Sequence, residues 1–265
     1  MTPHLPACGI LTLLTDFGRA DGYVAAMKGT ALSISPTLRV VDITHDVPRQ
    51  DIFRAALILK QVAPTFPAGT VHVVVVDPGV GTERRPVVVE SGDQYYVGPD
   101  NGVLTLAARP PRRAYNITNG DLMLERLSRT FHGRDIFAPT GAHLACSASL
   151  EDVGPAIDDI TEIPLPRPTF DKGSITGEVI YADQYGNLMV NICQDHLAGI
   201  EPDSMTLTVS GISIEGLKQT YGDVGIGDLV FYIGSTGYLE VARREGNARH
   251  YLGAPRGAHI VLHHG

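Results

Sequence analysis

Residues 71–85 read VHVVVVDPGVGTERR, an apolar run that ends at Asp77 and passes into a glycine-rich turn with two arginines. Two further runs have the same form, residues 10–15 before Asp16 and residues 38–41 before Asp42. Near-continuous apolar runs of this length are typical of parallel strands that are buried on both faces. Because ligands of open α/β sheets bind beyond the carboxyl ends of the strands, we expect the three carboxylates to converge on one site.

Helix-like segments alternate with these runs over the first 160 residues. Residues 22–34 and 51–62 carry apolar side chains three and four positions apart, and residues 134–147 have the character of a later helix. Such spacing predicts helices that pack one face against a core. The alternation predicts an α/β fold over residues 1–161, with a mostly parallel sheet covered by helices.

A proline-rich stretch follows, in which residues 163–170 read IPLPRPTF. Proline sustains neither a helix interior nor a central strand, so residues 162–173 are predicted to form a linker. Beyond it, short β-branched segments alternate with turns that contain Gly, Asn or Asp. Residues 174–265 are therefore predicted to form a smaller all-β domain, a barrel or sandwich.

Composition limits the classes of partner. The chain has 265 residues and a formal net charge of −8, with 43% hydrophobic and 19% charged residues. These values are typical of globular proteins, and the negative charge argues against nucleic acid or a membrane surface as partner. Three cysteines without a CxxC pair, and an N-terminal apolar run too short for a signal peptide, predict a cytoplasmic protein.

Three constellations in the first domain carry candidate chemistry. Asp77 and Arg84 can face each other across the glycine-rich turn and hold a small polar molecule. His132 precedes a glycine and a predicted helix, where an imidazole stays accessible, although a lone histidine in a chain with ten of them is more often structural. The third constellation, residues 98–102 with the sequence GPDNG, has the composition of an ordinary turn.

Two turns of the predicted β domain are the other candidates. Residues 183–187 form either a plain hairpin turn or a base-recognition loop. In the second case Tyr185 supplies a stacking face, and the amide of Asn187 supplies a donor and an acceptor for a purine edge. Ser235, in the turn 234–238, has an exposed hydroxyl that suits either a plain turn or a carboxylate contact.

The ordered combination of motifs is more specific than any of them alone. The motifs are residues 14–18 with Asp21 and Tyr23, residues 42–45, residues 76–82 with Arg84 and Arg85, and residues 98–102, 131–135, 183–187 and 235–239. In this order, from about residue 10 to the C-terminus, the chain resembles the S-adenosyl-L-methionine hydroxide adenosyltransferases. That family hydrolyses S-adenosyl-L-methionine to adenosine and L-methionine and is related to fluorinase and chlorinase.

The resemblance implies roles for particular residues. A catalytic triad falls on Asp77, Arg84 and His132. The implied substrate-binding residues are Asp16 at the ribose hydroxyls, Asp21, Asp183 and Ser235 around the methionine portion, and Tyr185 and Asn187 at the adenine. The family also implies a homotrimer, with each site between the N-terminal domain of one subunit and the C-terminal domain of the next.

Two departures from fluorinase favour water over halide as the nucleophile. Residues 77–80 read DPGV where fluorinase has Tyr-Pro-Ala-Thr, and Gly133 replaces a halide-contacting serine. A carboxylate at Asp77 repels fluoride, and the side chain of Val80 donates no hydrogen bond. Thr236 stands where fluorinase has an arginine.

The chemistry that the resemblance implies needs neither metal nor cofactor, because the sulfonium sulfur leaves as a neutral thioether. Two alternatives follow from the residues alone. One is a metal-dependent phosphohydrolase acting on a nucleotide, with oxygen and nitrogen ligands drawn from Asp16, Asp42, His45, Asp46, Asp77, Asp100 and His132. The other is an adenosine- or S-adenosyl-L-methionine-binding protein without turnover.

Overall fold

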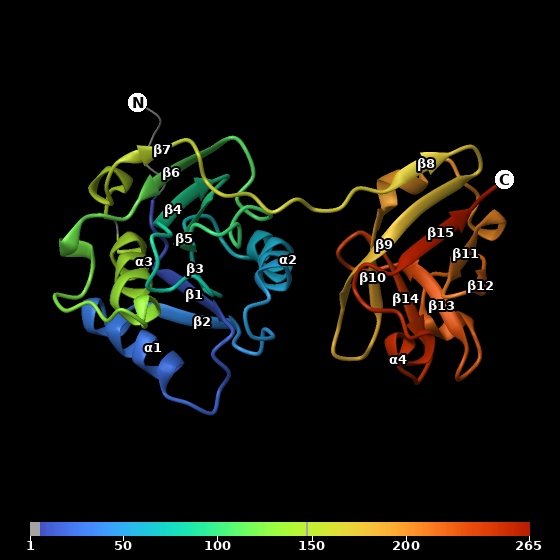
Figure 1. Ribbon diagram of the computed structural model, residues 1–265, viewed down its shortest axis with the longest axis horizontal. Helices are drawn as coiled ribbons and strands as arrows, with labels where there is room; N and C mark the ends of the chain where they lie inside the picture. Colours follow the sequence, from blue (N-terminus) through green and yellow to red (C-terminus); the bar gives the residue numbers. More distant parts are fainter. Residues whose placement is uncertain (1–5, 147) are drawn as a thin grey trace. The chain divides into compact units, whose positions relative to one another are not determined.

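The computed structural model describes residues 6–146 and 148–265, which form two compact units that divide between Pro164 and Leu165 (Figure 1). Residues 1–5 and Ser147, which belong to the N-terminal run and to the predicted third helix, lie outside the described residues. The division falls within the segment 162–173. Part of this segment is a short strand, β8 (Thr169–Asp171), which pairs with the second unit.

The first unit contains a seven-stranded sheet in the order β2-β1-β3-β5-β4-β6-β7. The strands are β1 (Ile10–Thr15), β2 (Arg39–Thr44), β3 (Val71–Val75), β4 (Pro86–Ser91), β5 (Gln94–Pro99), β6 (Arg112–Asn116) and β7 (Ala156–Ile157). Strands β2, β1, β3 and β5 pair in parallel, whereas β5, β4, β6 and β7 pair antiparallel. The sheet is mixed, so the prediction of a mostly parallel sheet is correct only for its first half.

A tight turn explains the change of direction. Only Gly92 and Asp93 separate β4 from β5, and Gly92 has a φ of +58°. A parallel pair needs a crossover of a dozen or more residues, so a connection this short forces the two strands to run antiparallel.

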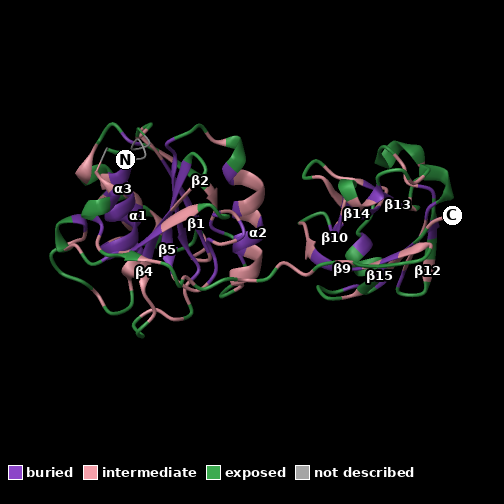
Figure 2. Ribbon diagram, turned by 90° about the horizontal axis from the view of Figure 1, so that it is seen from above, coloured by how far each residue is buried: buried purple, intermediate pink, exposed green. Residues whose placement is uncertain are grey.

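Strand β2 differs from the prediction in another way. It lies at the edge of the sheet and is largely exposed, and Asp42 lies inside it, opposite Leu13 of β1. Strands β1 and β5, in contrast, are buried (Figure 2). The run 38–41 is therefore not a doubly buried strand with a carboxylate at its end, as its apolar residues predicted.

Helices cover both faces of the sheet. They are α1 (Tyr23–Ile34), α2 (Ile52–Val62) and α3 (Ala138–Ala145). Alternate side chains of β3 point to opposite faces, so that Val73 joins the core with α1 and α3, and Val74 joins the core with α2. Helix α3 continues a π-helical turn, Gly133–Phe137, which occupies the start of the predicted helix 134–147.

Short 3-10 helices complete the chain. They are Ala63–Thr65, Gly120–Leu122, Leu150–Asp152, Gln194–Leu197, Pro202–Ser204 and Tyr221–Asp223. Over the part of the chain that the structure describes, no helix has both the length and the apolar character needed to cross a membrane.

The second unit is an antiparallel sheet that curls into a nearly closed barrel, as predicted. Its strands are β8, β9 (Ser174–Ala182), β10 (Leu188–Cys193), β11 (Thr206–Val209), β12 (Ile212–Glu215), β13 (Leu229–Ile233), β14 (Tyr238–Arg243) and β15 (His259–His263). They follow the order β12-β11-β15-β9-β10-β14-β13. A bridge between Lys218 and Tyr232 brings the chain after β12 against β13.

The sequence analysis missed one short helix of this unit, α4 (Ala248–Leu252). It is capped by Asn247, whose side chain accepts a hydrogen bond from the backbone N–H of His250, and it ends at Gly253 with a φ of +58°. A capping residue at each end of only five helical residues was not enough to predict a helix among the surrounding strands.

A buried histidine makes the stability of the first unit depend on pH. His72 on β3 is fully buried, its Nδ1 lies 2.7 Å from Thr12 Oγ1, and its ring stacks on Tyr96. Burial lowers its pKa from 6.5 to about 4. Between these two values the unfolded chain binds more protons than the folded one, so stability is lost as the pH falls, by up to about 3 kcal/mol.

We therefore expect His72→Gln to flatten this loss. Native-state hydrogen exchange at the amides of β1 and β3, followed from pH 7 to pH 4.5, should show a smaller fall in the free energy of opening than in the wild type. His259→Gln, which removes an exposed histidine on β15, serves as the control and should keep the wild-type slope. An equal slope in His72→Gln would contradict the assignment.

Candidate functional site

A buried ion pair lies at the carboxyl end of β3. Arg84 Nε donates to both carboxylate oxygens of Asp77 at 3.0 Å, and Arg84 Nη2 donates to Asp77 Oδ2. The side chain of Asp77 is 5% exposed and that of Arg84 is 10% exposed. The facing pair predicted from a spacing of seven residues is thus present. Its burial distinguishes it from an exposed ion pair, which contributes little.

The turn that joins these two residues depends on Gly81. It has a φ of +79°, and a Cβ at this position would lie 2.8 Å from the carbonyl oxygen of Arg129. Glycine therefore allows the turn to approach the segment that leads to His132. Within the turn, the Thr82 hydroxyl donates to the carbonyl of Gly79 at 2.7 Å and holds the chain compact.

His132 completes a contiguous group with this pair. Its Nδ1 lies 2.8 Å from Arg84 Nη2. A guanidinium can only donate, so Nδ1 accepts, and in the neutral ring the proton is on Nε2. Arg84 therefore bridges Asp77 and His132, and its guanidinium also lies 5.2 Å from the centre of the Phe137 ring.

The electrostatics of the group favour a neutral imidazole. Burial is the largest cause that lowers the pKa of His132 below its usual 6.5, and the charge of Arg84 lowers it further. The carboxylates of Asp77 and Asp135 oppose this shift without reversing it. At neutral pH the ring is uncharged, and its Nε2–H can donate a hydrogen bond.

Asp16 lies at the same end of the sheet, because it follows β1, whose Thr15 pairs with Val75 of β3. Its Oδ2 accepts a hydrogen bond from the backbone N–H of Gln50 at 2.7 Å. The ring of the adjacent Phe17 packs against Phe131, the residue before His132. Asp21 is exposed in the segment that leads into α1.

Asp42 does not join this group, so the expected convergence of three strand-end carboxylates is wrong for this residue. Its Oδ2 accepts a hydrogen bond from Lys28 Nζ at 2.6 Å, and its Oδ1 lies 3.0 Å from Nε2 of the buried His45. Burial raises the pKa of Asp42, but the contacts with Lys28 and His45 outweigh it, and the net shift is downward. This is a structural network on an edge strand.

The described residues offer little to a metal ion. Within residues 6–146 and 148–265, no three or more His, Cys, Asp or Glu side chains gather in a way that could hold one. Of the ligands weighed for a phosphohydrolase, Asp77 is bound to Arg84, and Asp100 is bound to Arg85.

In the second unit, the turn between β9 and β10 is held by its own side chains. Asp183 Oδ1 and Oδ2 accept hydrogen bonds from the backbone N–H and the side-chain Nδ2 of Asn187, both at 2.9 Å. One amide N–H of Asn187 is thus engaged within the turn. Tyr185 is 69% exposed and presents its ring to solvent, as a stacking face requires.

Gly186 brings this turn against the start of α4. It has a φ of +85°, and a Cβ there would lie 2.2 Å from atoms of the Asn247 side chain. The backbone N–H of Arg249 donates to the carbonyl of Gly186 at 2.9 Å. Asn247 is therefore part of this region, although the sequence analysis did not single it out, and its only signal was the helix-capping residue type.

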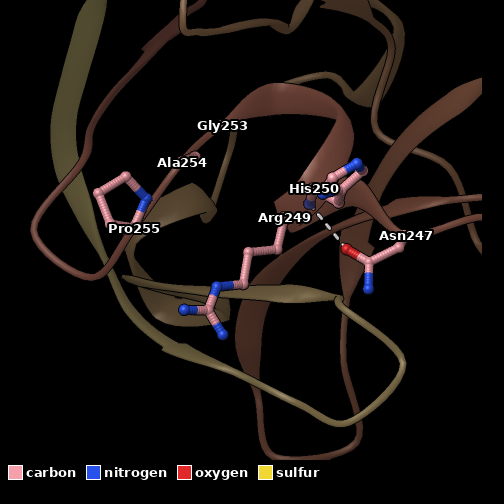
Figure 3. Close-up of a pocket in the computed structure, with 6 residues that line it drawn as sticks. All are labelled: Asn247, Arg249, His250, Gly253, Ala254 and Pro255. Atoms are coloured by element: carbon pink, nitrogen blue, oxygen red, sulfur yellow. Dashed lines mark hydrogen bonds between the residues drawn. The ribbon is translucent and has the colours of Figure 1, made fainter.

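A pocket of about 540 Å³ opens beside Asn247. It is lined by Asn247, Arg249, His250, Gly253, Ala254 and Pro255. In Figure 3 the side-chain oxygen of Asn247 points to the backbone of His250, and the side chain of Arg249 extends away from that contact. Polar side chains and backbone groups therefore gather where α4 meets the 183–187 turn.

Ser235 is exposed in the turn between β13 and β14. Near this turn, Glu240 on β14 accepts a hydrogen bond from the Tyr232 hydroxyl at 2.8 Å, and a Cβ at Gly234 would overlap its carboxylate. Burial is the main cause that raises the pKa of Glu240, and the charge of Asp183 raises it further. The sequence analysis did not single out Glu240, because no sequence pattern distinguishes it from other polar residues of a strand.

The predicted site residues thus form two groups, one in each unit. Arg84 contacts both Asp77 and His132, with Asp16 at the same sheet end, whereas Asp183 and Asn187 are bonded to each other in the barrel.

Both units match known domains. The SAM hydroxide adenosyltransferase N-terminal domain matches residues 11–154, and the corresponding C-terminal domain matches residues 177–261. A relative in Salinispora tropica, named (R)-S-adenosyl-L-methionine hydrolase, is 42% identical over 252 residues, 93% of this chain and 95% of the relative. A fluorinase of Actinoplanes sp. is 32% identical over 276 residues, 90% of this chain and 93% of the relative.

A solved structure agrees with these matches. The crystal structure of an uncharacterized conserved protein from Thermotoga maritima has a TM-score of 0.88 at 34% identity and covers 95% of this chain and 99% of that one. The two domains define the class of protein, an α/β domain followed by a barrel-like β domain. The chain belongs to the SAM hydroxide adenosyltransferase family, which confirms the resemblance inferred from its motifs.

The contact between Arg84 and His132 can be tested without substrate. Arg84→Ala removes the positive charge that lowers the pKa of His132 and keeps the carboxylate of Asp77, which raises it, so the pKa of His132 should rise. An NMR titration of the histidine ring protons measures this shift. Arg126→Ala, which removes an exposed arginine of the same unit, is the control and should leave the titration of His132 unchanged. An unshifted His132 in Arg84→Ala would mean that the two side chains are apart in solution.

Proposed function

We propose that this chain hydrolyses S-adenosyl-L-methionine to adenosine and L-methionine by in-line attack of a water molecule on C5′, with Asp77, Arg84 and His132 as the catalytic residues. The observation that carries the proposal is the bridge of Arg84 between Asp77 and His132 in a chain of this family. The relatives named (R)-S-adenosyl-L-methionine hydrolase support the substrate and the reaction.

The chemistry places its demand on the nucleophile. The sulfonium sulfur leaves as a neutral thioether, so its departure needs no acid. Water is a weak nucleophile and must lie about 3–3.5 Å from C5′, opposite the sulfur. Asp77 orients this water and takes up its proton, the Nε2–H of the neutral His132 donates a hydrogen bond to it, and Arg84 stabilises the developing hydroxide.

The remaining residues bind the substrate. Asp16 accepts hydrogen bonds from the ribose hydroxyls, and Asp21 pairs with the ammonium of the methionine portion. Asp183 and Ser235 contact the same portion. The exposed ring of Tyr185 stacks on the adenine, and Asn187, held in place by Asp183, reads the edge of the base.

Water is preferred to halide for reasons visible in the site. The carboxylate of Asp77 repels an anion, and Val80 offers no side-chain donor. At Gly133, a Cβ would lie 3.3 Å from Met27 Sδ and 3.4 Å from the ring of Phe17, so a serine there would be crowded.

The rest of the proposal concerns the state of the protein. The enzyme works without a metal ion or cofactor and acts in the cytoplasm, where its three unpaired cysteines stay reduced. It assembles as a homotrimer with its sites at subunit interfaces, as the resemblance to the family implies. A metal-dependent phosphohydrolase is disfavoured, because two of its candidate ligands, Asp77 and Asp100, are paired with Arg84 and Arg85, and because relatives are named (R)-S-adenosyl-L-methionine hydrolase. A binding protein without turnover is disfavoured by the catalytic names of the relatives.

Each single substitution of a catalytic residue should lower the rate of adenosine formation at least about a hundredfold, because it removes acid–base or electrostatic help at one water molecule. The variants are Asp77→Asn, Arg84→Ala and His132→Ala, and double variants should lose little more than single ones. Chromatography of adenosine and methionine measures the rate.

Asp42→Asn is the matched control for these variants, since it disrupts a carboxylate–cation contact of the same unit outside the site. It should keep the rate within a few-fold of the wild type. Near-normal activity of Arg84→Ala would overturn the assignment of the triad. Loss of activity on treatment with a chelator, followed by recovery when magnesium, manganese or zinc is added back, would favour the phosphohydrolase.

The route of attack can be read from the product. In ¹⁸O-labelled water the label should enter the 5′-hydroxyl of adenosine and not methionine, and a stereospecifically deuterated C5′ should be inverted. A covalent route through Asp77 would need two displacements and would give net retention. Retention at C5′ would therefore rule out direct attack, even with adenosine and methionine as products.

A further inference from the structure

The turn at residues 98–102 does more than reverse the chain. Strand β5 lies between β3 and β4 in the sheet, and the loop from Asp77 to Arg84 connects the end of β3 to the start of β4. The loop therefore crosses the carboxyl end of β5. Residues 100 and 101, which come directly after β5, lie where the loop leaves one neighbouring strand and enters the other.

Asn101 holds the first end of this loop. Its side-chain Nδ2 donates to the carbonyl of Val76 at 2.9 Å, and its Oδ1 accepts from the backbone N–H of Val103 at 3.1 Å. The second bond is local and suffices for an ordinary turn. The first reaches 25 residues back along the chain to the residue before Asp77, at a carbonyl that lies beyond the end of β3.

Asp100 holds the other end. Its Oδ2 accepts from Arg85 Nε at 3.0 Å and from Nη2 at 2.6 Å, and its backbone N–H donates to the carbonyl of Arg85 at 2.9 Å. Its Oδ1 accepts from the backbone N–H of Thr161 at 2.7 Å. The Asp100 side chain is only 5% exposed, whereas that of Arg85 is 30% exposed. The residue after Arg84 is thereby attached to the same turn.

We propose that Asp100 and Asn101 are positioning residues that clamp the two ends of the 77–84 loop and so set where Arg84 meets Asp77 and His132. The inference rests on the proposed function for its catalytic consequence, but the clamp itself is a property of the loop. A displacement of about 1 Å in a reacting group can cost up to a hundredfold in rate, so two side chains that each hold one loop end can affect the rate without touching the substrate.

The chain offers a matched control for Asn101. Asn119 makes the same two kinds of bond, with Nδ2 donating to the carbonyl of Asp152 at 2.8 Å and Oδ1 accepting from the N–H of Asp121 at 3.0 Å. It stabilises another loop of the same unit. Substitutions of Asn119 therefore show the effect of a weakened turn alone, and any larger effect of substituting Asn101 is due to the clamp.

We expect Asn101→Ala and Asn101→Asp each to lower kcat at least about tenfold with KM within about twofold. The aspartate keeps the local acceptor, loses the donor to Val76 and adds a negative charge that Asn119→Asp also adds, so it is the second variant if the alanine variant does not fold. Asn119→Ala and Asn119→Asp should keep kcat within about twofold. Equal effects of the Asn101 and Asn119 substitutions would overturn the proposal.

Asp100 is tested in the same way against Asp159, the other carboxylate that binds Arg85. Asp159 is 80% exposed and pairs with Arg85 Nη1 at 2.7 Å. Asp100→Ala should lower kcat as the Asn101 variants do, whereas Asp159→Ala should not. In an Arg84→Ala background Asn101→Ala should add less than about a twofold loss, because the clamp acts through Arg84. Full additivity would contradict this route.

A measurement without substrate separates this inference from the proposed function. If the clamp holds the pair against His132, then Asn101→Ala, which adds no charge, should shift the NMR titration of His132 upward, and Asn119→Ala should not. The clamp is supported by this shift even if the wild-type protein does not hydrolyse S-adenosyl-L-methionine. An unshifted His132 in Asn101→Ala would refute it whatever the activity.

Discussion

The pairing of Asp77 with Arg84 is the constraint on which the first unit depends most directly. Both side chains are almost fully buried, and removing one partner of a buried ion pair costs about 3–5 kcal/mol, because the other charge is left uncompensated. The chain therefore has to bring two residues seven positions apart into one orientation. Gly81 lets the loop pass close to Arg129, and that approach places His132 against the guanidinium.

The strand order of the mixed sheet allows the loop between β3 and β4 to be short. If the sheet were parallel throughout, the chain leaving β3 would enter a helix and return on the far side of a crossover. Here β4 is the antiparallel neighbour of β5, so the loop only spans the end of one intervening strand. The departure from the expected parallel sheet is thus the feature that allows a short loop to carry both members of the ion pair.

A fluorinase and an (R)-S-adenosyl-L-methionine hydrolase are both similar in sequence to this chain, over 90% and 93% of its length. A carboxylate bound to an arginine stands at the end of β3, and Gly133 lies against Met27 and Phe17 with little room for a larger residue. In the barrel, the two carboxylate oxygens of Asp183 accept hydrogen bonds from Asn187, which hold the 183–187 turn. Both units thus present their polar groups on loops that are held by internal hydrogen bonds.

The sequence by itself determined the division into an α/β part and a β part, the first two helices, and the buried strands β1 and β3. Apolar periodicity is a local signal, and it needs no knowledge of distant residues. The ordered motifs identified the family and pointed to Asp77, Arg84 and His132. The sequence did not predict the edge position of β2, since a run of four apolar residues looks the same at the edge of a sheet as at its centre.

Only the tertiary structure decided which side chains meet. It separated Asp42 from the other strand-end carboxylates, because strand order is set by pairing between distant segments. It also revealed that the turn at residues 98–102, ordinary in composition, reaches the carbonyl of Val76 and the side chain of Arg85. Contacts between residues far apart in the chain arise from the packing of the whole sheet, and no local pattern encodes them.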